Sequence, residues 1–332
     1  MSHYLITGGA GFIGSHLSEA LLERGHYVTV IDNLSTGRFE NIAPLVGNPR
    51  FRFAIDTITN EIVMDRLVSE CDIVVHMAAV VGVELILKDP VNVIETNILG
   101  THFVLKVANR YRKQVLFAST SEIYGKNENV PFREDDDRVL GPATVARWSY
   151  SSSKAVDEFL SLAYHRKNDL PVVIFRLFNT VGPRQTGRYG MVIPRFVRQA
   201  LSGEPITVYG DGNQARCFVH VKDVVEAIIA LSACPQAIGQ VFNIGSTDEV
   251  SILELAHRVL KLADAALGRA PTGIDERVRL VPYEQAYTAG FEDMKRRMPD
   301  IGKIGRYVGW QPRSSLDEIL QDVIQFSMQR SQ

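Results

Sequence analysis

Two residues four positions apart, Tyr150 and Lys154, could together remove a proton from an alcohol. They lie in WSYSSSKAVDEF, a stretch predicted to be helical, and this spacing places both side chains on one face of a helix. A cation beside a phenol favours the phenolate and lowers the phenol pKa toward the working pH. Such a tyrosine can take a hydroxyl proton while hydride leaves the same carbon. A surface tyrosine beside a solvated lysine has the same spacing, so the pair alone does not establish a site.

A glycine-rich turn, TGGAGFIG, lies between the first predicted strand and the first predicted helix. Without side chains at Gly8, Gly11 and Gly14, the backbone can turn tightly and approach a pyrophosphate at the helix N-terminus. Asp32 ends the second strand, where a carboxylate can accept hydrogen bonds from a ribose diol and repels a 2′-phosphate. Asn33 follows it in place of a basic residue, so NAD is favoured over NADP. The cofactor contacts predicted in this region are Gly8, Gly11, Phe12, Ile13, Gly14, Asp32 and Asn33.

Strand-like and helix-like stretches alternate along the first half of the chain. Short segments rich in β-branched residues predict strands, and the amphipathic segments between them predict helices. The predicted strands are 3–7, 27–32, 71–78, 113–120 and 170–177, and the predicted helices are 14–25, about 90–111 and about 148–167. Strands this apolar on both faces suit a parallel sheet covered by helices, so we predict a doubly wound α/β sheet of the Rossmann type.

Beyond about residue 180 the pattern becomes irregular and rich in proline and glycine. The elements expected there are a helix at 222–233 and a strand at 240–245 that return to the sheet, a helix at 251–263, a loop-rich stretch to about 312 and a final helix. We therefore predict a NAD-binding Rossmann domain and a smaller, discontinuous α/β substrate lobe. The first comprises residues 1–180 plus 215–245, and the second comprises residues 181–214 plus 246–332.

Composition argues against several classes of protein. A hydrophobic content of 45% and a charged content of 22% are ordinary for a globular protein, and a net charge of −2 gives no general attraction to nucleic acid or anionic membranes. Neither a membrane-spanning apolar run nor a secretory leader is expected. The three cysteines lack metal-ligand spacing and are what a reducing compartment permits. We expect a cytoplasmic protein without a metal site, a nucleic-acid partner or membrane attachment.

The order of these motifs resembles the extended short-chain dehydrogenase/reductase family over nearly the whole chain. The glycine-rich turn, the acidic end of the second strand, HMAA, TNILGT, the STS strand end and Y-x-x-x-K occur in the family's order. The resemblance implies that Tyr150 is the general base, that Lys154 holds the nicotinamide ribose and that Thr120 hydrogen-bonds the reacting hydroxyl. It also implies that the helices at 90–111 and 148–167 pair across a homodimer interface. The further NAD contacts that it implies are Asp56, Thr57, Ala78, Ala79, Asn97, Ser119, Tyr150 and Lys154.

Three later segments resemble the branch of this family that acts on nucleotide-diphosphate sugars, namely RLFNTVGPR, PITVYGDGNQARCFVHVKDV and MPDIGKIGRYVGWQP. Arginine and asparagine donors suit phosphate and ribose oxygens, and arginine can make forked contacts. TVYG would supply backbone and an aromatic ring around the base. The resemblance favours UDP as the nucleotide. The expected substrate-binding residues are Glu84, Asn179, Arg184, Val208, Tyr209, Arg216 and Arg297.

Members of this branch oxidise the sugar at C4, and the resulting ketone has three fates. Return of hydride to the other face gives a 4-epimer, and elimination of the C6 hydroxyl gives a dehydrated sugar. If C6 is a carboxylate, the ketone is part of a β-keto acid that can lose carbon dioxide. Dehydratases typically carry Thr-Asp-Glu after the fifth strand, whereas Thr120-Ser121-Glu122 resembles the UDP-glucuronate decarboxylases. GFEDMKRRMPDI resembles the C-terminal signature of these decarboxylases, in which the arginine that reaches the site is Arg297.

We therefore predict a NAD-dependent UDP-glucuronate decarboxylase, in which Arg297 and Ser121 orient the uronate carboxylate and Glu122 manages charge or protons around C5. Because neighbouring carboxylates repel, Glu122 must be protonated or directed elsewhere; it could instead cap the following turn or pair with a core arginine. Ser153 before the lysine and Thr57 after the third strand depart from the usual patterns. They keep a UDP-sugar 4-epimerase, including one for UDP-glucuronate, as the second hypothesis. A nucleotide-sugar dehydratase or a non-catalytic NAD-binding protein would also carry the glycine turn and the Rossmann pattern.

Overall fold

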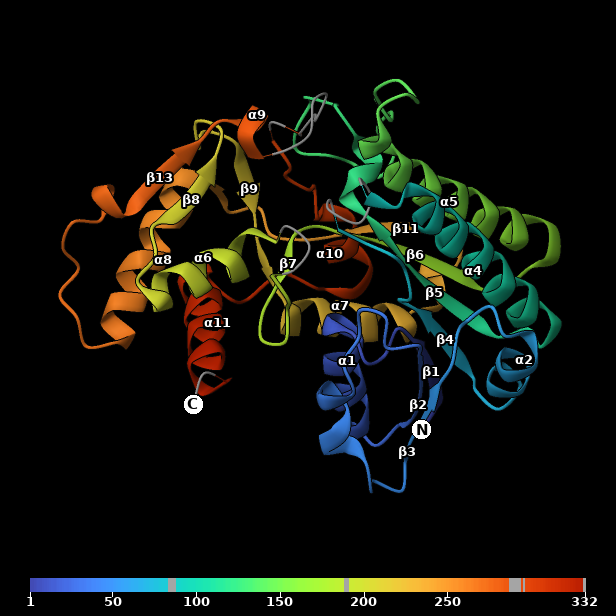
Figure 1. Cartoon of the computed structure of the whole chain (residues 1–332). Coiled ribbons are helices and arrows are strands. Elements are labelled where there is room, and N and C mark those ends of the chain that lie inside the picture. Colours follow the sequence, from blue (N-terminus) through green and yellow to red (C-terminus); the bar gives the residue numbers. More distant parts are fainter. Residues whose placement is uncertain (83–87, 188–190, 287–293, 295, 331–332) are drawn as a thin grey trace.

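A parallel sheet of seven strands forms the centre of the larger lobe (Figure 1). The computed structural model describes residues 1–82, 88–187, 191–286, 294 and 296–330. In sheet order the strands are β11 (Val241–Ile244), β6 (Val172–Leu177), β5 (Gln114–Thr120), β4 (Ile73–His76), β1 (His3–Thr7), β2 (Tyr27–Asp32) and β3 (Phe51–Ile55). All pairings in this sheet are parallel, and the strand order reverses between β1 and β4. This is the doubly wound Rossmann topology, so the predicted fold class is confirmed.

Helices cover both faces of the sheet, because successive side chains along a strand point to opposite sides. Tyr4 and Ile6 of β1 pack into a core shared with α1, α7 and α10, whereas Leu5 packs into a second core with α2 and α4. On this second side α5 lies beside α4 (Figure 1). The first face is covered by α1 (Phe12–Glu23), α7 (Val221–Ser232) and α10 (Gly302–Val308), and the second by α2 (Glu61–Ser69), α4 (Pro90–Arg110) and α5 (Ser149–Asn168).

The smaller lobe has an apolar core of its own. Val197, Ala256 and Ile319 are fully buried in it and come from three different helices. The elements of this lobe are α6 (Val192–Ser202), β8 (Ile206–Tyr209), α8 (Ile252–Ala266), β13 (Val278–Val281), α9 (Tyr283–Ala286) and α11 (Leu316–Arg330). The short strand pairs are β8 with β13, β7 (Thr180–Val181) with β10 (Val219–His220), and β9 (Ala215–Cys217) with β12 (Glu249–Ser251). The two lobes lie side by side in Figure 1.

Two helices occupy stretches that the sequence pattern made irregular. In α6 the proline, Pro194, lies in the first turn, where a missing N–H removes no intrahelical hydrogen bond. The expectation of loops up to about residue 312 was wrong at α10, a short helix that buries Ile304 against the large lobe. Two glycines, Gly302 and Gly305, weaken the helical pattern of this segment. Tertiary packing therefore stabilises α10 where local propensity does not.

The carboxyl ends of the sheet strands meet at one edge, and the residues with predicted chemistry follow them. β1 leads into the glycine turn at Gly8, β2 ends at Asp32 and β5 ends at Thr120. A short 3₁₀ helix, η3 (Ser121–Tyr124), directly follows β5, and Tyr150 lies in the first turn of α5. In doubly wound sheets, ligands bind outside this edge where the strand order reverses. The topology thus brings the cofactor turn and the acid–base residues to one side of the sheet.

Candidate active site

A cavity of about 510 Å³ is lined by residues of this sheet edge and of the smaller lobe. It brings together residues that are far apart in the sequence, from the glycine turn to the C-terminal signature. The sequence-predicted residues that line it are Gly8, Gly11, Phe12, Ile13, Gly14, Asp32, Asn33, Asp56, Thr57, Ala78, Ala79, Ser119, Thr120, Ser121, Glu122, Tyr150, Lys154, Asn179, Tyr209, Arg216 and Arg297. Most of the residues expected from the sequence to contact cofactor, reacting groups or sugar nucleotide therefore share one continuous space.

Arg184, expected to bind phosphate, does not line this cavity. Its guanidinium donates to the Ser15 hydroxyl at 3.2 Å and to the Glu19 carboxylate at 2.6 Å, both on α1. Its backbone has a φ of 70°, a conformation that few residues other than glycine adopt and that sets the side-chain direction. Arg184 therefore joins this loop to α1 instead of facing a ligand. Glu84, which was also predicted to bind the substrate, lies outside the described residues.

Val208 and Asn97 do not line the cavity either. Successive side chains along β8 point to opposite sides, so Tyr209 faces the cavity and Val208 is fully buried in the core of the smaller lobe. The Asn97 side chain accepts the N–H of Val80 at 2.9 Å and donates to the Ser153 hydroxyl at 3.2 Å. Asn97 thus ties the segment after β4 to α5, which is a supporting position behind the cavity wall.

The glycine turn provides a space that a side chain would fill. Gly8 has a φ of 70°, and a Cβ built on it would lie 2.9 Å from the backbone nitrogen of Ala78. A Cβ on Gly14 would lie 2.5 Å from the carbonyl oxygen of Gly8. Gly11 is the N-cap of α1, so the unpaired N–H groups and the positive dipole end of that helix adjoin the turn. This cradle fits the pyrophosphate of NAD.

Asp32 is held in place at the end of β2. Its two carboxylate oxygens accept the N–H of Leu34 at 2.8 Å and the N–H of Ala10 at 3.0 Å. Burial raises the pKa of this carboxyl, and the two hydrogen bonds oppose that rise. Asn33 and Ser35, which are uncharged, line the cavity beside it. An oriented acid with these neighbours suits the ribose diol of NAD and disfavours a 2′-phosphate.

Tyr150 and Thr120 meet where α5 crosses the end of β5. The Thr120 hydroxyl hydrogen-bonds the Tyr150 phenol, and both side chains line the cavity. Burial raises the pKa of the phenol above its ordinary value, and the Glu122 carboxylate acts in the same direction. Thr120 and the Arg147 guanidinium oppose the rise without overcoming it. The phenolate therefore needs a further positive charge near the ring, and the oxidised nicotinamide of bound NAD carries one.

Lys154, which the sequence spacing indicated would lower the Tyr150 pKa, is not among the largest influences on that pKa. Its ammonium donates to the carbonyl oxygen of Ala118 at 2.9 Å and lies 4.5 Å from the centroid of the Phe117 ring. Burial lowers the pKa of Lys154, and nearby carboxylates, Asp157 first among them, oppose this. An ammonium has three donors, so the hydrogen bond to Ala118 leaves capacity for a ribose hydroxyl in the cavity.

Glu122, directly after β5, lies among arginine side chains. Both terminal nitrogens of Arg147, from the 3₁₀ helix η4 (Ala146–Trp148), donate to the two Glu122 carboxylate oxygens, one of them at 3.0 Å. A terminal nitrogen of Arg297 lies 3.6 Å from the same carboxylate. Burial alone would raise the pKa of Glu122, but Arg147, Arg297 and Arg216 outweigh it and hold the pKa below its usual range. Glu122 is therefore an anion paired with a core arginine, one of the arrangements weighed from the sequence.

This cluster is rich in positively charged side chains. Three guanidinium groups, those of Arg147, Arg216 and Arg297, act on one carboxylate, and all three line the cavity. Only 2% of the Arg147 side chain and 11% of the Arg297 side chain are exposed to solvent. Cations withdrawn from water favour anionic ligands that can form forked hydrogen bonds. The cavity is thus suited to a carboxylate and a diphosphate together.

Sequence reasoning missed several lining residues, of which Arg147, Arg195 and Ile58 are the most informative. Arg147 lies three residues before Tyr150, in the 3₁₀ helix η4 that leads directly into α5, and this closeness in sequence was the available signal. Arg195 of α6 places its guanidinium 3.9 Å from the centroid of the Tyr209 ring. Ile58 follows Thr57, the residue that departs from the usual family pattern, and supplies an apolar side chain one position later.

Over nearly its whole length, the chain is similar to enzymes of nucleotide sugars. Residues 5–323 match the family model described as GDP-mannose 4,6 dehydratase. The UDP-N-acetyl-alpha-D-glucosaminuronate decarboxylase of Bacillus cytotoxicus is 43% identical over 323 residues, which cover 97% of this chain and 96% of that protein. UDP-glucuronic acid decarboxylase 1 of Arabidopsis thaliana is 37% identical over 316 residues, 95% of this chain and 67% of that protein. A solved structure of a mutant UDP-glucuronic acid 4-epimerase from Bacillus cereus, in complex with UDP-4-deoxy-4-fluoro-glucuronic acid and NAD, is 29% identical with a TM-score of 0.85 and 99% coverage of both chains.

Proposed function

We propose that this chain, which belongs to the extended short-chain dehydrogenase/reductase family and within it to the GDP-mannose 4,6-dehydratase-like nucleotide-sugar enzymes, is a NAD-dependent decarboxylase of a UDP-linked uronate. Bound NAD would supply the hydride acceptor for oxidation at C4 of the sugar and the hydride donor for the later reduction. Tyr150 removes the C4 hydroxyl proton as the general base, while the Thr120 hydroxyl orients the same oxygen. Lys154 holds the ribose next to the nicotinamide.

Oxidation at C4 prepares the bond that breaks. The C4 ketone lies β to the C6 carboxylate, so the electron pair of the C5–C6 bond can move to C5 and be held as an enolate with its charge on the C4 oxygen. Carbon dioxide leaves, C5 takes up a proton, and hydride return restores the C4 alcohol. The hydroxyls of Thr120 and Tyr150 can donate to the enolate oxygen and stabilise its charge. Because hydride returns to the sugar, no NAD is consumed.

The observation that carries this proposal is the cluster of arginines that lines the cavity. Arg147 pairs with Glu122 through both of its terminal nitrogens, and the guanidinium groups of Arg297 and Arg216 lie in the same cavity, where they suit anionic groups. We assign Arg297 and the buried Ser121 to the uronate carboxylate, and Arg216 with Asn179 to the UDP moiety. As an ionised group, Glu122 holds the arginines in register, and the proton that C5 takes up comes from solvent and not from this carboxylate. Ser121 in place of the dehydratase aspartate argues against elimination.

The substrate proposed from the sequence is UDP-glucuronate, and the similarities support a second candidate. The relative at 43% identity is named for the 2-acetamido analogue, UDP-N-acetylglucosaminuronate, whereas the UDP-glucuronic acid decarboxylases are 35% to 37% identical. The two substrates share the C4 hydroxyl and C6 carboxylate on which the mechanism depends. They differ only at C2, so the same residues serve either one.

The proposed function is tested by NMR of each UDP-uronate incubated with the enzyme and NAD. We expect carbon dioxide and the corresponding UDP-pentose, UDP-xylose or its 2-acetamido analogue, without net NADH. Turnover of one substrate at a rate at least tenfold higher identifies the native one, since a contact to a single substituent contributes about 1–3 kcal/mol. UDP-galacturonate as the product would replace decarboxylation with 4-epimerisation. Bound but unreacted nucleotide sugars would indicate a non-catalytic protein.

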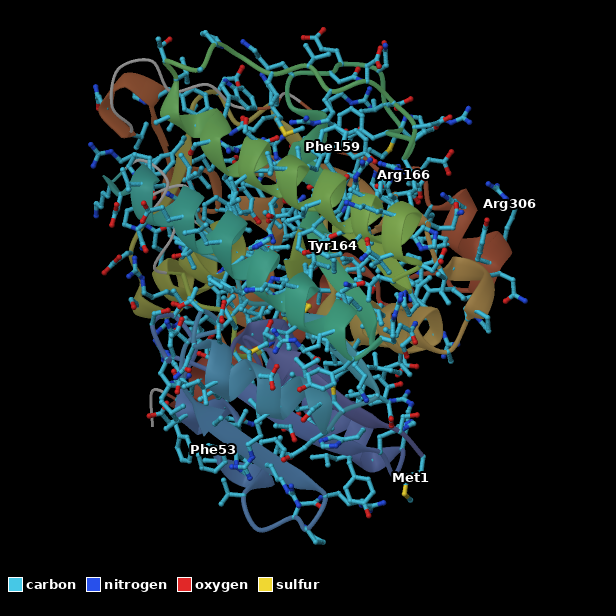
Figure 2. The ribbon with its side chains drawn as sticks, turned by 90° about the vertical axis from the view of Figure 1, so that its right-hand side faces the viewer. Met1, Phe53, Phe159, Tyr164, Arg166 and Arg306 are labelled. Carbon is cyan, nitrogen blue, oxygen red and sulfur yellow. The ribbon has the colours of Figure 1, made fainter. Side chains whose placement is uncertain are left out.

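We also propose that the chain forms a homodimer through α4 and α5, as the family resemblance implies. The outer face of these helices carries exposed apolar side chains, among them Phe159 on α5 (Figure 2). These residues are Val91, Ile94 and Leu99 of α4 and Val156 and Phe159 of α5. Phe159 has 63% of its surface exposed in the single chain, which is unfavourable for an aromatic ring unless a partner covers it.

Replacing Phe159 with glutamate is expected to convert the dimer into a monomer at low micromolar concentration. Loss of an aromatic anchor and burial of a charge weaken an interface by about 2–4 kcal/mol, or roughly 30- to 1,000-fold in dissociation constant. Light scattering after size-exclusion chromatography measures the change. The matched control is Ile62→Glu on α2, where 84% of the side-chain surface is exposed outside this face. A Phe159→Glu protein that stays dimeric would contradict the proposed interface.

The domain division and the location remain part of the proposal. We assign NAD binding to residues 1–180 plus 215–245 and the sugar nucleotide to residues 181–214 plus 246–332. Within the described part of the chain, no helix has the length and apolar character needed to cross a membrane. Cys71, Cys217 and Cys234 are all free thiols, which supports a cytoplasmic location.

A further inference from the structure

A buried acid, Asp157, lies one turn after Lys154 on α5 and has no part in the mechanism above. None of its surface is exposed, and among the residues that the structure describes neither carboxylate oxygen has a hydrogen-bond partner of normal geometry. Burying a carboxylate without such partners is unfavourable unless a nearby positive charge compensates. The feature is therefore costly to the fold and calls for a function.

A row of buried side chains approaches Asp157 from the cofactor side of the sheet. The Thr7 hydroxyl oxygen, at the end of β1, accepts the N–H of Met77 at 3.2 Å and the N–H of Ala78 at 3.1 Å. Both of these residues line the cavity after β4. Since the Thr7 oxygen accepts from two backbone donors, its own hydrogen is directed to Nδ1 of His76, 2.7 Å away.

The direction of the remaining hydrogen bonds follows from this first step. Burial holds the pKa of His76 at about 3, with Lys154 acting in the same direction, so the ring is neutral. With Nδ1 as an acceptor, Nε2 carries the hydrogen and donates to the Thr101 hydroxyl at 3.1 Å. Thr101 therefore has its hydrogen free, and its hydroxyl lowers the pKa of the Asp157 carboxyl. The hydrogen bonds of the row thus run from the cavity wall toward Asp157, although among the described residues none of normal geometry reaches its carboxylate.

Asp157 and Lys154 also act on each other's charge. Burial raises the pKa of Asp157 to about 6, and Lys154 is the main opposing influence, while Glu158 adds to the rise. Burial lowers the pKa of Lys154, and Asp157 is the first group that opposes it, followed by Glu158. Glu158 is committed elsewhere, because both its carboxylate oxygens accept from Arg176 at 2.9 and 2.8 Å. Of these two acids, Asp157 is therefore the one whose charge is not already neutralised by Arg176.

We propose that Asp157 is a positioning residue for the reaction, which keeps Lys154 charged and fixes the wall formed by Met77 and Ala78 through the Thr7–His76–Thr101 row. The acid does not touch the substrate; it acts through the lysine on one side and through the threonine and histidine on the other. This inference rests on the proposed function for its kinetic test.

The substitution Asp157→Asn is expected to move the pH profile of kcat to lower pH. Without the carboxylate, the Lys154 pKa falls, so the alkaline loss of activity begins earlier. The Tyr150 pKa also falls, because Asp157 raises it in the wild type, so the acid limb shifts in the same direction. At pH 9 the variant should be about tenfold less active than the wild type, as expected for a pKa shift of about one unit. Below about pH 6, where Asp157 is itself protonated, the two profiles should converge.

The matched control is Ser161→Ala, which removes from the same helix another fully buried polar group that has no hydrogen-bond partner among the described residues. It should leave both limbs unchanged. A second variant, Thr101→Val, deletes the hydroxyl that lowers the Asp157 pKa, so the fall in melting temperature caused by ionisation of Asp157 should extend above pH 6 in this variant, even if Asp157→Asn does not fold. Unchanged limbs in Asp157→Asn, or a fall in melting temperature that ends at the wild-type pH in Thr101→Val, would overturn the assignment.

The charge of Asp157 can also be tested without a substrate. Its pKa is raised on folding, so its ionisation reduces stability above the ordinary carboxyl range, and this loss is complete once the pH exceeds about 6. The melting temperature of Asp157→Asn minus that of the wild type should therefore increase between pH 4 and pH 7. A constant difference would overturn an ionised Asp157. Absence of wild-type turnover with this melting signature intact would sink the proposed function alone.

Discussion

Replacing Tyr150 with phenylalanine is expected to lower the turnover rate by about 10³-fold or more, while NAD binding persists. The phenol is the group at the end of β5 that can accept the C4 hydroxyl proton, and Thr120 can orient that hydroxyl but cannot replace the base. General-base catalysis typically contributes 10²–10⁴-fold, and both hydride transfers depend on it here. Quantitative NMR of the product and titration of NAD by fluorescence separate the two effects.

The matched control for this variant is Tyr164→Phe, on the same helix. Tyr164 packs against the core beneath α5 and does not line the cavity (Figure 2). Its substitution should leave kcat within about twofold, as expected for a side chain distant from the reacting atoms. A Tyr150→Phe enzyme that retains a tenth of wild-type activity would exclude Tyr150 as the base and with it the proposed mechanism.

The second large effect is expected at Arg147, a residue that the sequence analysis did not single out. Arg147→Met should destabilise the fold by about 3–5 kcal/mol and eliminate decarboxylation. The substitution leaves the Glu122 carboxylate buried without its bidentate partner, and the positive charge that opposes the Tyr150 pKa rise is lost. Urea unfolding measures the first effect, and release of carbon dioxide measures the second.

A double-mutant cycle identifies the cause of this loss. Adding Glu122→Gln to Arg147→Met removes the stranded charge, so the double variant should recover at least half of the lost stability. Glu122→Gln alone tests the role of the carboxylate at C5, because oxidation at C4 and loss of carbon dioxide can be assayed separately. Unchanged decarboxylation in that variant would remove Glu122 from the chemistry. The surface control is Arg166→Met, on an exposed position of α5 (Figure 2).

The sequence predicts those features that depend on spacing along one element. Tyr150 and Lys154 share a helix face, and the glycine turn precedes its helix, so local geometry places them without knowledge of the rest. The strands of the large sheet were likewise predictable, because two buried faces require nearly continuous apolar runs. These predictions depend on period and propensity, which are local properties of the chain.

Contacts between distant segments were not predictable in the same way. The sequence cannot show that Arg184 reaches α1, or that the Lys154 ammonium faces a β5 carbonyl instead of the phenol. Arg147 was missed because charged residues are usually exposed, and only tertiary packing shows that this one is buried against Glu122. Val208 could have been excluded, since strand alternation allows only one of two neighbours, Val208 or Tyr209, to face the cavity.

The shielding of the arginine cluster has a consequence for the conditions under which the enzyme can work. Dissolved ions weaken attraction between exposed charges over a Debye length of about 10 Å at 0.1 M salt, but they act much less on groups withdrawn from water. Arg147 and Arg297 are almost entirely withdrawn. Preference for an acidic sugar over a neutral one should therefore persist when the osmotic state of the cell changes, since mobile counter-ions cannot easily reach the groups that confer it.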